Sequence, residues 1–562
     1  METVYGVGIS KNILFGKCVF FEQEALNSDF VRVHDVDLEL DRWKKAVKET
    51  NLQLTELYKN TIDTVGTANA MIVKTHKYIL NDTAFVGKIE EQIKNLSCNA
   101  EYAVFIAEKY FTKTLTLTGN EYIKTRADDI KEICLVLINN LRGSGHKGRV
   151  EFFRMLGDRA ESESLIVVAH EIFVADVLDF ERFQIKGFIT KAGSAMAHAS
   201  ILAQSLGLVA LVGTGKNLRD FGNKNVVISG AENLAILSPD QEAIEKYLKQ
   251  KKNWDREKIR LKSMIERGSF TKDGHKVKIM ASVTGLKDAQ KAKECGAVGI
   301  GLFRSEFIYL GRETPPSEQE QFEVYRGLLE ISEDNPVFIR TIDVGPDKMP
   351  DYFSSLISAG SWFAIRGIRF CLENPEVFIT QLRALLRASV YGRLKIVLPM
   401  VTSVAEIEKT KKIFESLKNE LDRSQIAYDK DVALGIMIET PAAVMIADKL
   451  AKIVDFFSIG TNDLTQLAFA VDRNSESSKG FLMDDAVILR MVDVVVLAAK
   501  KYGIPVSVCG IYANDVVFLC NFVGLGVDSL SVPAEHVGEV RKKINGLSFV
   551  EQVSTVENKI KN

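Results

Sequence analysis

Charged and polar side chains recur directly after short apolar segments in the second half of the chain. The candidates for binding, metal or proton chemistry are Arg304, Arg340, Lys348, Arg366, Glu439, Asn462, Asp463, Arg473 and Cys509. Several cations that converge on one cavity repel one another, and a bound polyanion relieves that repulsion. Arginine forks match the geometry of phosphate and carboxylate groups. The set therefore predicts a site for a small anionic phosphate ester.

Two carboxylates accompany these cations. Glu439 follows the apolar segment 432–438, and Asp463 comes soon after the segment 456–459. Carboxylate oxygens are hard ligands that hold Mg2+ beside a phosphate group. Because phosphoryl transfer needs mostly positioning and charge neutralisation, the set favours a phosphate ester with bound Mg2+. Taken singly, each residue type has a commoner structural explanation, namely a surface ion pair, a core cysteine or a helix cap.

His198 lies in the first half of the chain. An apolar strand at 187–190 is expected to lead into a loop of small residues, 191–196, and then into a helix. A helix start offers free N–H groups to a phosphoryl group, and a histidine nitrogen is a competent nucleophile. His198 is therefore a candidate phosphoryl acceptor, although a lone histidine is more often structural. The other six are expected to be structural or solvated: His34, His76, His146, His170, His275 and His536.

Apolar strands alternate with helical patterns over roughly the last 290 residues, and these elements must position the candidate residues of the second half of the chain. The strands are expected at 277–283, 298–303, 337–342, 362–365, 394–398, 432–438, 456–459 and 506–508. Eight such units predict a (β/α)8 TIM barrel, whose active site lies at the carboxyl ends of the strands. The joint placement of the candidates at these ends favours a site over coincidence.

The first half of the chain divides differently. Residues 36–143 contain no proline and show helical periodicity, which predicts an antiparallel helical bundle. Short apolar strands on both sides of it predict an α/β domain, 1–35 and 144–238, that carries His198 and into which the bundle is inserted. The charged segment 239–268 is expected to be a connector helix before the barrel domain, 269–562.

Composition narrows the class of protein. Lys and Arg (72) nearly balance Asp and Glu (74) among the 562 residues, which argues against a nucleic-acid or membrane-surface binder. Seven cysteines without a two-residue spacing indicate free thiols in a reducing compartment. The N-terminus lacks a secretory pattern and the apolar stretches are too short for a membrane span. We therefore expect a cytoplasmic protein.

Three segments of the barrel half carry a resemblance to a known family. They read GIGLFRSE (299–306), IETPAA (438–443) and FFSIGTNDLTQ (456–466), and AVDR (470–473) follows them. Over essentially its full length the chain resembles enzyme I of the bacterial phosphoenolpyruvate:sugar phosphotransferase system, the phosphoenolpyruvate-protein phosphotransferases. The resemblance implies an α/β domain with a phosphohistidine and an inserted helical bundle, a connector helix and a C-terminal (β/α)8 barrel.

The resemblance also implies roles. His198 matches the phosphorylated histidine, and Cys509 matches the acid that protonates C3 of the enolate to give pyruvate. The residues that match contacts to phosphoenolpyruvate or supporting cations are Arg304, Arg340, Lys348, Arg366, Asn462, Asp463 and Arg473. Glu439 and Asp463 match the ligands of Mg2+. The family is a homodimer through its barrels, and its helical bundle docks the small phosphocarrier HPr, to which phospho-His198 would pass its phosphoryl group.

Alternatives arise where the chain departs from the family. The family usually has Gly-Gly-x-Thr-Ser before the active histidine, whereas this chain reads GSAMA at 193–197. This motivates a second hypothesis, a divergent paralogue that binds phosphoenolpyruvate as a sensor. The retained Glu439, Asp463, Arg473 and Cys509 speak against it. A pyruvate dikinase is a third reading, but those enzymes carry a large nucleotide-binding domain upstream of the helical block, which the short segment before residue 36 does not supply.

Overall fold

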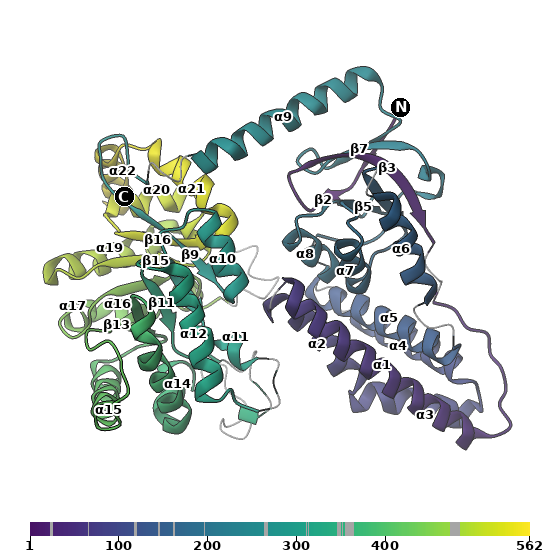
Figure 1. Cartoon of the computed structure of the whole chain (residues 1–562), viewed down its shortest axis with the longest axis horizontal. Coiled ribbons are helices and arrows are strands. Elements are labelled where there is room, and N and C mark those ends of the chain that lie inside the picture. The colour runs from purple at the N-terminus through teal and green to yellow at the C-terminus, as the bar shows by residue number, and fades with distance from the viewer. Residues whose placement is uncertain are drawn as a thin grey trace. The chain divides into compact units, whose positions relative to one another are not determined.

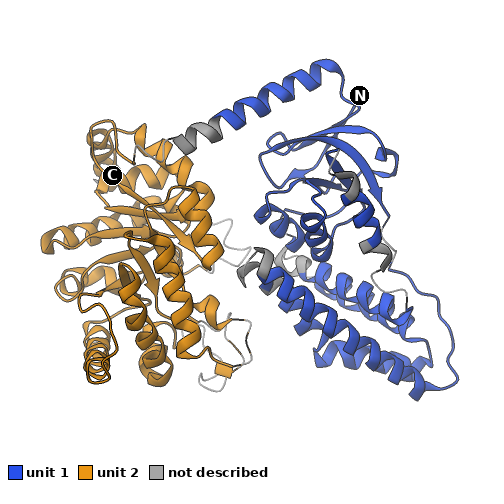
Figure 2. Ribbon diagram, in the orientation of Figure 1, with its two compact units in different colours: residues 1–257 blue, residues 258–562 orange. Residues whose placement is uncertain are grey.

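The computed structural model divides the chain into two compact units, residues 1–257 and 258–562 (Figure 2). It describes the chain except for residues 23–25, 66, 117–120, 144–146, 161, 162, 196, 264–267, 311, 313, 345–349, 351, 354–364, 472–483 and 562. Each unit has its own hydrophobic core, and each is described separately below.

The first unit is built on an eight-stranded mixed sheet with the strand order β1-β8-β7-β3-β4-β5-β6-β2. Strands β3 to β6 are parallel neighbours, and every residue of β4, β5 and β6 is buried. Such continuous apolar runs are typical of parallel strands that are covered on both faces. The strands are β1 (Glu2–Tyr5), β2 (Val7–Gly8), β3 (Ile13–Phe21), β4 (Leu165–Ala169), β5 (Gly187–Thr190), β6 (Val209–Val212), β7 (Asn225–Ser229) and β8 (Leu234–Leu237).

A helical bundle is inserted between β3 and β4, as the sequence predicts (Figure 1). Its helices are α1 (Val36–Val65), α2 (Thr67–Leu80), α3 (Thr83–Leu96), α4 (Ala100–Thr116) and α5 (Glu121–Leu141), and α6 (Lys147–Ala160) leads back to the sheet. Helices α1 and α2, and α4 and α5, pack along each other. Trp43 of α1, Ile89 of α3 and Leu137 of α5 are fully buried in the shared core of the bundle. The bundle therefore brings side chains of α2 and α5 next to the α/β part of the unit.

Three further helices complete the first unit. Helix α7 (Val174–Arg182) follows β4, and α8 (His198–Ser205) follows β5 and begins at the candidate acceptor histidine. Helix α9 (Gln241–Ser263) is the charged helix predicted as a connector. Its Tyr247 is buried and packs with Val227 and Ile236 of the sheet, so the start of α9 belongs to the first unit.

The second unit is a closed barrel of eight parallel strands. The strands are β9 (Lys278–Val283), β10 (Ile300–Arg304), β11 (Val337–Arg340), β12 (Leu394–Leu398), β13 (Ala433–Ile438), β14 (Phe457–Gly460), β15 (Val506–Cys509) and β16 (Ser529–Pro533). The predicted (β/α)8 architecture is confirmed. Because all strands run in one direction, their carboxyl ends form one rim.

Helices cover the outside of this barrel (Figure 1). They are α10 (Leu286–Glu294), α11 (Glu306–Tyr309), α12 (Glu318–Ser332), α13 (Ile368–Glu373), α14 (Pro375–Ala388), α15 (Val404–Arg423), α16 (Pro441–Met445), α17 (Ala447–Leu450), α18 (Thr461–Phe469), α19 (Asp485–Tyr502), α20 (Val516–Leu525), α21 (Val537–Asn545) and α22 (Phe549–Lys561). Their apolar faces pack onto the strands in one continuous core. None of the helices in the described parts of either unit combines the length and apolarity that crossing a bilayer requires.

One predicted strand was wrong. Residues 362–365 were expected to be the fourth barrel strand, but β11 pairs directly with β12, from Val337 with Leu394 to Arg340 with Val397. Residues 362–364 lie outside the described residues, and Ile365 lies in a bend. The strand that closes the ring instead is β16, which the sequence analysis missed. It alternates serine with apolar residues, and Ser531 Oγ lies 2.8 Å from Ser282 Oγ of β9, so its polar residues hid it from a search for apolar runs.

Candidate active site

Candidate side chains stand at the carboxyl ends of several barrel strands. Arg304 ends β10, Arg340 ends β11 and Cys509 ends β15, while Glu439 directly follows β13. Asn462 and Asp463 lie in the first turn of α18, directly after β14. The structure thus brings this part of the predicted set to the same rim. The predicted Lys348 and Arg473 lie outside the described residues.

Arg340 is buried among carboxylates. Its Nη2 donates to Glu306 Oε1 at 2.8 Å, and its Nη1 lies 2.8 Å from Asp343 Oδ2. Burial opposes the charge of Arg340, but the carboxylates of Glu306 and Asp343 outweigh it and raise its pKa further. Its Nε is buried without a hydrogen-bond partner among the described residues. A guanidinium held in this way is a fixed cation with donor capacity to spare.

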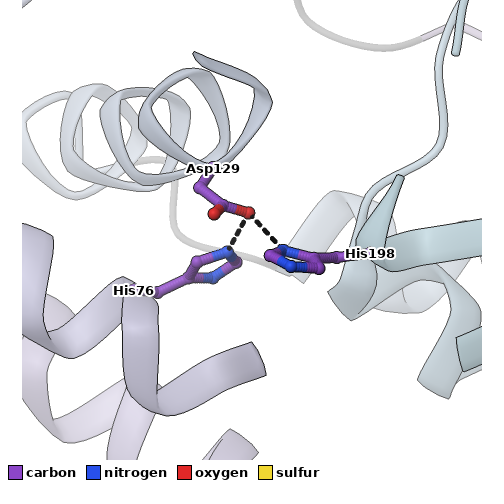
Figure 3. Close-up of side chains that lie close together, drawn as sticks. All are labelled: His76, Asp129 and His198. Carbon is purple, nitrogen blue, oxygen red and sulfur yellow. Dashed lines mark hydrogen bonds and ion pairs between the residues drawn. The ribbon is translucent and has the colours of Figure 1, made fainter. Parts of the chain in front are cut away.

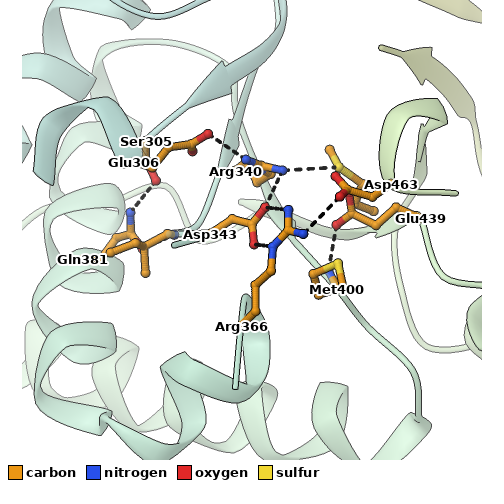
Figure 4. Close-up of polar contacts among 11 residues, drawn as sticks. Ser305, Glu306, Arg340, Asp343, Arg366, Gln381, Met400, Glu439 and Asp463 are labelled. Atoms are coloured by element: carbon orange, nitrogen blue, oxygen red, sulfur yellow. Dashed lines mark hydrogen bonds and ion pairs between the residues drawn. The ribbon is translucent and has the colours of Figure 1, made fainter. Parts of the chain in front are cut away.

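Arg366 points at the same carboxylate from the opposite side (Figure 4). Its Nε and Nη2 donate to the two oxygens of Asp343 at 2.8 and 2.9 Å, and its Nη1 donates to Asp463 Oδ1 at 3.0 Å. The residue lies just before α13, in the segment between β11 and β12, and not at the end of a strand as predicted. Asp343 therefore bridges two guanidinium groups, which lie within one cluster and do not face different sides of the unit.

Glu439 and Asp463 supply the carboxylates of this cluster that a metal could use. Glu439 is fully buried, and its Oε1 accepts from the Met400 backbone N–H at 2.7 Å. Burial, and then the charges of Asp463 and Asp343, raise the pKa of Glu439 well above its usual range. A side chain at Gly460 would meet Glu439 Oε2 at 2.9 Å, so glycine leaves room for this oxygen. Crowded carboxylates of this kind fit a hard divalent cation.

Cys509 is a buried thiol within the same end of the barrel. It is 2% exposed and packs against Leu302, Phe338 and Met437. Its Sγ lies 3.4 Å from the Ile459 carbonyl oxygen and 3.8 Å from Ser458 Oγ. Burial raises the pKa of Cys509 to about 11. The thiol therefore keeps its proton at neutral pH, as a general acid requires.

Two further predicted residues have structural contacts at the rim. Asn462 Oδ1 accepts from the Ile511 backbone N–H at 2.8 Å, which ties α18 to the segment after β15. Gly510, the residue before Ile511, has a φ of 99°. A side chain at this position would come within 2.3 Å of Thr461 Oγ1, so only glycine fits there. The Arg304 guanidinium lies over the Phe307 ring, 5.2 Å from its centre. Asn462 thus holds the rim together through its carbonyl oxygen.

His198 begins α8 in the first unit and is in contact with the helical bundle (Figure 3). Its Nδ1 lies 2.8 Å from Asp129 Oδ1, and the same oxygen lies 3.1 Å from Nε2 of His76. Burial opposes ionisation of Asp129, but the hydrogen bonds with His198 and His76 outweigh it and lower its pKa to about 2. The Nε2 of His198 makes no hydrogen bond within the described residues. The arrangement fixes one ring nitrogen and leaves the other available.

Sequence reasoning missed several members of both clusters. Asp129 was not considered, and His76 was expected to be structural or solvated; its ring is fully buried and bonded to the partner of His198, which a search of the sequence did not link to that residue. Glu306 and Asp343 were not among the candidate residues. No local signal marks Asp129, because an acidic residue on an amphipathic helix normally faces water.

Comparison with known proteins finds similarity over almost the whole chain. Family models for PEP-utilising enzymes, where PEP is phosphoenolpyruvate, match residues 5–126 (N-terminal), 161–233 (mobile domain) and 258–549 (PEP-binding domain). The phosphoenolpyruvate-protein phosphotransferase of Bacillus subtilis (strain 168) is 34% identical over 559 residues, 99% of this chain and 96% of the relative. That of Priestia megaterium is 33% identical over 549 residues, 97% of this chain and 94% of the relative.

These matches extend through both units and include the barrel rim and the segment that carries His198. Similarity at this level over almost the full length of both chains leaves no large part of the molecule without a counterpart. The chain belongs to the family of phosphoenolpyruvate-protein phosphotransferases.

Proposed function

We propose that the protein transfers the phosphoryl group of phosphoenolpyruvate to His198, releases pyruvate, and passes the group on to a histidine of an HPr-type phosphocarrier. The observation that carries this proposal is the cluster at the barrel rim. There, the guanidinium group of Arg340, two metal-competent carboxylates and a protonated thiol lie at or just after the carboxyl ends of parallel strands, and the guanidinium group of Arg366 joins them from the segment before α13. Each has a part in handling an enol phosphate.

The cations bind the substrate. Arg340 and Arg366 are held by carboxylates at 2.8–3.0 Å, so their positions are set before an anion arrives. Preorganised donors of this kind stabilise charge without reorganisation during the reaction. Arg304 stands on the adjacent strand β10, and we assign Lys348 and Arg473 to the same substrate by family resemblance. Asn462 is assigned as a further contact.

Glu439 and Asp463 would hold Mg2+. The bound ion supplies charge neutralisation for the phosphoryl oxygens. The residues fit it, because the burial of Glu439 beside Asp463 and Asp343 leaves negative charge that a divalent cation offsets. Arg366 donates to Asp463 Oδ1, which leaves Oδ2 for the cation.

Cys509 is assigned as the acid that completes the reaction. The bond between phosphorus and the enol oxygen breaks as the bond between phosphorus and a nitrogen of His198 forms. The enolate that leaves takes a proton at C3 from the thiol to give pyruvate, and solvent later returns a proton to the thiolate. With its pKa raised to about 11, the thiol holds its proton until the enolate forms.

His198 is assigned as the acceptor through its Nε2. The contact of 2.8 Å between Nδ1 and Asp129 favours the tautomer in which Nδ1 carries the proton, so the lone pair lies on Nε2. After the transfer the ring carries a proton on Nδ1 and a phosphoryl group on Nε2. The carboxylate of Asp129 stabilises the positive charge that this places on the ring.

The remaining assignments concern partners and organisation. We assign carrier docking to the helical domain, 36–143, inserted in a phosphohistidine domain of residues 1–35 and 144–238. A connector, 239–268, joins these to the barrel domain, 269–562. Exposed apolar side chains on the barrel helices support self-association through that domain: Met445, Val494, Leu497, Val516 and Val517. A cytoplasmic location agrees with the free thiols of the described cysteines.

The experiment follows both products. Purified protein is incubated with phosphoenolpyruvate labelled at phosphorus, Mg2+ and candidate carriers, and pyruvate and labelled carrier are measured together. We expect equimolar pyruvate and phosphoryl-carrier, with both lost in His198→Ala. Binding of phosphoenolpyruvate without pyruvate or label would refute the proposal and would favour the sensor hypothesis, which no feature of the comparisons supports.

A further inference from the structure

The cluster around His198 has the composition of a transition-metal site. One possible ligand atom from each of His76, Asp129 and His198 lies within 4.8 Å of the other two. These residues come from α2, α5 and α8, so the tertiary fold and not a local motif brings them together (Figure 3). Within the described residues this is the one group of three such side chains that meets this criterion.

The ligand types and spacings fit Zn2+. Imidazole nitrogen and carboxylate oxygen are zinc ligands, with bonds of about 2.0–2.2 Å in tetrahedral geometry. Two ligand atoms on such a tetrahedron are about 3.3 Å apart. The observed distances from Asp129 Oδ1 are 2.8 Å to His198 Nδ1 and 3.1 Å to His76 Nε2. These two distances need to grow by only a few tenths of an ångström to suit an ion, and the ligand atoms of the two histidines, which lie within 4.8 Å of each other, would approach by up to about 1.5 Å.

The surroundings of the cluster favour a cation. Asp128, Glu132 and Glu171 line the same cavity as Asp129 and His198. Glu132 Oε2 lies 3.9 Å from His76 Nε2, within reach of a fourth coordination position. The Arg126 guanidinium lies 3.4 Å from Asp129 Oδ2, which leaves Oδ1 for the two imidazoles. Arg126 and Lys131, whose Nζ lies 3.6 Å from Asp128, stand against four carboxylates, so the cavity holds more carboxylates than the adjacent positive side chains balance.

The side chains of the cluster differ in solvent exposure, and this difference suits a site that binds its ion reversibly. The side chains of His76 and Asp129 are 0% and 3% exposed, and that of His198 is 18% exposed. An ion would thus be dehydrated on the side of the bundle and reachable from the side of His198. A neutral imidazole that binds zinc through the nitrogen facing Asp129 carries its proton on the other ring nitrogen, so zinc and the hydrogen-bonded arrangement are alternatives.

We propose that His76, Asp129 and His198 form a Zn2+ site, with Glu132 in reach as a fourth ligand, and that its occupation withholds His198 from phosphorylation. The first part is independent of the proposed function, and the second rests on it. Zinc bound at Nδ1 ties the ring to α2 and α5, and a neutral ring bound in this way carries its proton on Nε2 and has no lone pair there. Both effects oppose the attack of that nitrogen on phosphorus.

The binding test uses the full chain with Mg2+ in excess, so that the carboxylates of the barrel rim are occupied. Equilibrium dialysis against ZnCl2 with a competing chelator gives the affinity. The wild type should bind one Zn2+ that Asp129→Asn and His76→Gln weaken at least about 100-fold, because each removes a ligand. The exposed His170→Gln in the same unit and Glu439→Gln in the barrel should bind as the wild type does.

The visible absorption of bound Co2+ reports directly on the coordination of the ion, which a purely structural role of the three residues would not change. In the wild type it should show the intense visible absorption of a tetrahedral site with nitrogen and oxygen ligands, and Asp129→Asn should lose it. Thermal unfolding of the metal-free variants shows whether they are folded. Equal zinc affinity in wild type and both ligand variants, or loss of binding in His170→Gln alone, would overturn the site.

Labelling of His198 by phosphoenolpyruvate tests whether bound zinc withholds this residue from phosphorylation. Stoichiometric zinc should slow labelling of His198 by phosphoenolpyruvate at least about tenfold, and a chelator should restore it. Binding without slower labelling would overturn the second part and leave the site. Failure of labelling in the absence of zinc would instead refute the proposed function, while the dialysis and Co2+ measurements would still decide the site.

Discussion

Replacement of the Cys509 thiol separates binding from turnover in the proposed reaction. Cys509→Ala removes the acid but touches none of the fixed cations, because Sγ has its contacts with Ile459 and Ser458. A positioned general acid contributes about 10²–10⁴-fold to rate. We therefore expect kcat for pyruvate release to fall by that factor, which corresponds to a loss of about 3–5 kcal/mol of transition-state stabilisation. The affinity of the variant for phosphoenolpyruvate should stay within about twofold of that of the wild type.

The pH profile of the wild type follows from the same group. With a pKa of about 11, about one thiol in 10⁴ is ionised at pH 7, and a few per cent at pH 9.5. The acid is the protonated form, so its contribution is full below pH 10 and is lost as pH rises through about 11. A cysteine with the ordinary value of 9.0 would already have lost most of its protons at pH 9.5.

The assay couples pyruvate to a dehydrogenase at saturating carrier, and calorimetry gives the affinity for phosphoenolpyruvate in the same variants. Cys520→Ala, which removes a half-buried thiol from the outer helix α20, is the matched control and should turn over normally. Unchanged kcat in Cys509→Ala, a parallel loss of affinity, or a decline in wild-type activity centred near pH 9 would each refute the assignment.

Three other changes test the remaining assignments. Glu439→Gln should abolish both activity and its dependence on Mg2+ concentration, and residual activity that still titrates with Mg2+ would place the ion elsewhere. Arg366→Lys keeps the charge but loses the paired contacts with Asp343, so affinity for phosphoenolpyruvate should fall at least about tenfold by calorimetry. Asp129→Asn should slow labelling of His198 about 10²–10⁴-fold with unchanged calorimetric affinity for phosphoenolpyruvate, and equal labelling rates would contradict the role of Asp129.

The barrel could be predicted from the sequence because its strands are buried on both faces. Strands such as β12 and β13 are nearly continuous apolar runs, and the residues after them necessarily share one rim. Strand β16 escaped prediction because serine fills alternate positions, and a segment at 362–365 with the apolar character of a strand was taken in its place. Arg366 was thus placed on the wrong element.

The contacts of His198 could not be predicted in the same way. Asp129 lies 69 residues before His198 in sequence, and 53 residues after His76. Only the packing of the inserted bundle against the α/β part brings them together, and helical periodicity does not specify that packing. At the rim, by contrast, strand order alone brings Arg340 and Glu439 together. A parallel barrel therefore reveals its site in the sequence, and a contact between an inserted bundle and its host domain does not.

The most direct measurement is rapid quenching of the wild type with labelled phosphoenolpyruvate and Mg2+ in the absence of carrier, followed by peptide analysis under alkaline conditions. We expect one acid-labile phosphoryl group per chain on Nε2 of His198, formed at the rate at which one equivalent of pyruvate appears. A label on another residue, or pyruvate formed without a phosphorylated His198, would contradict it.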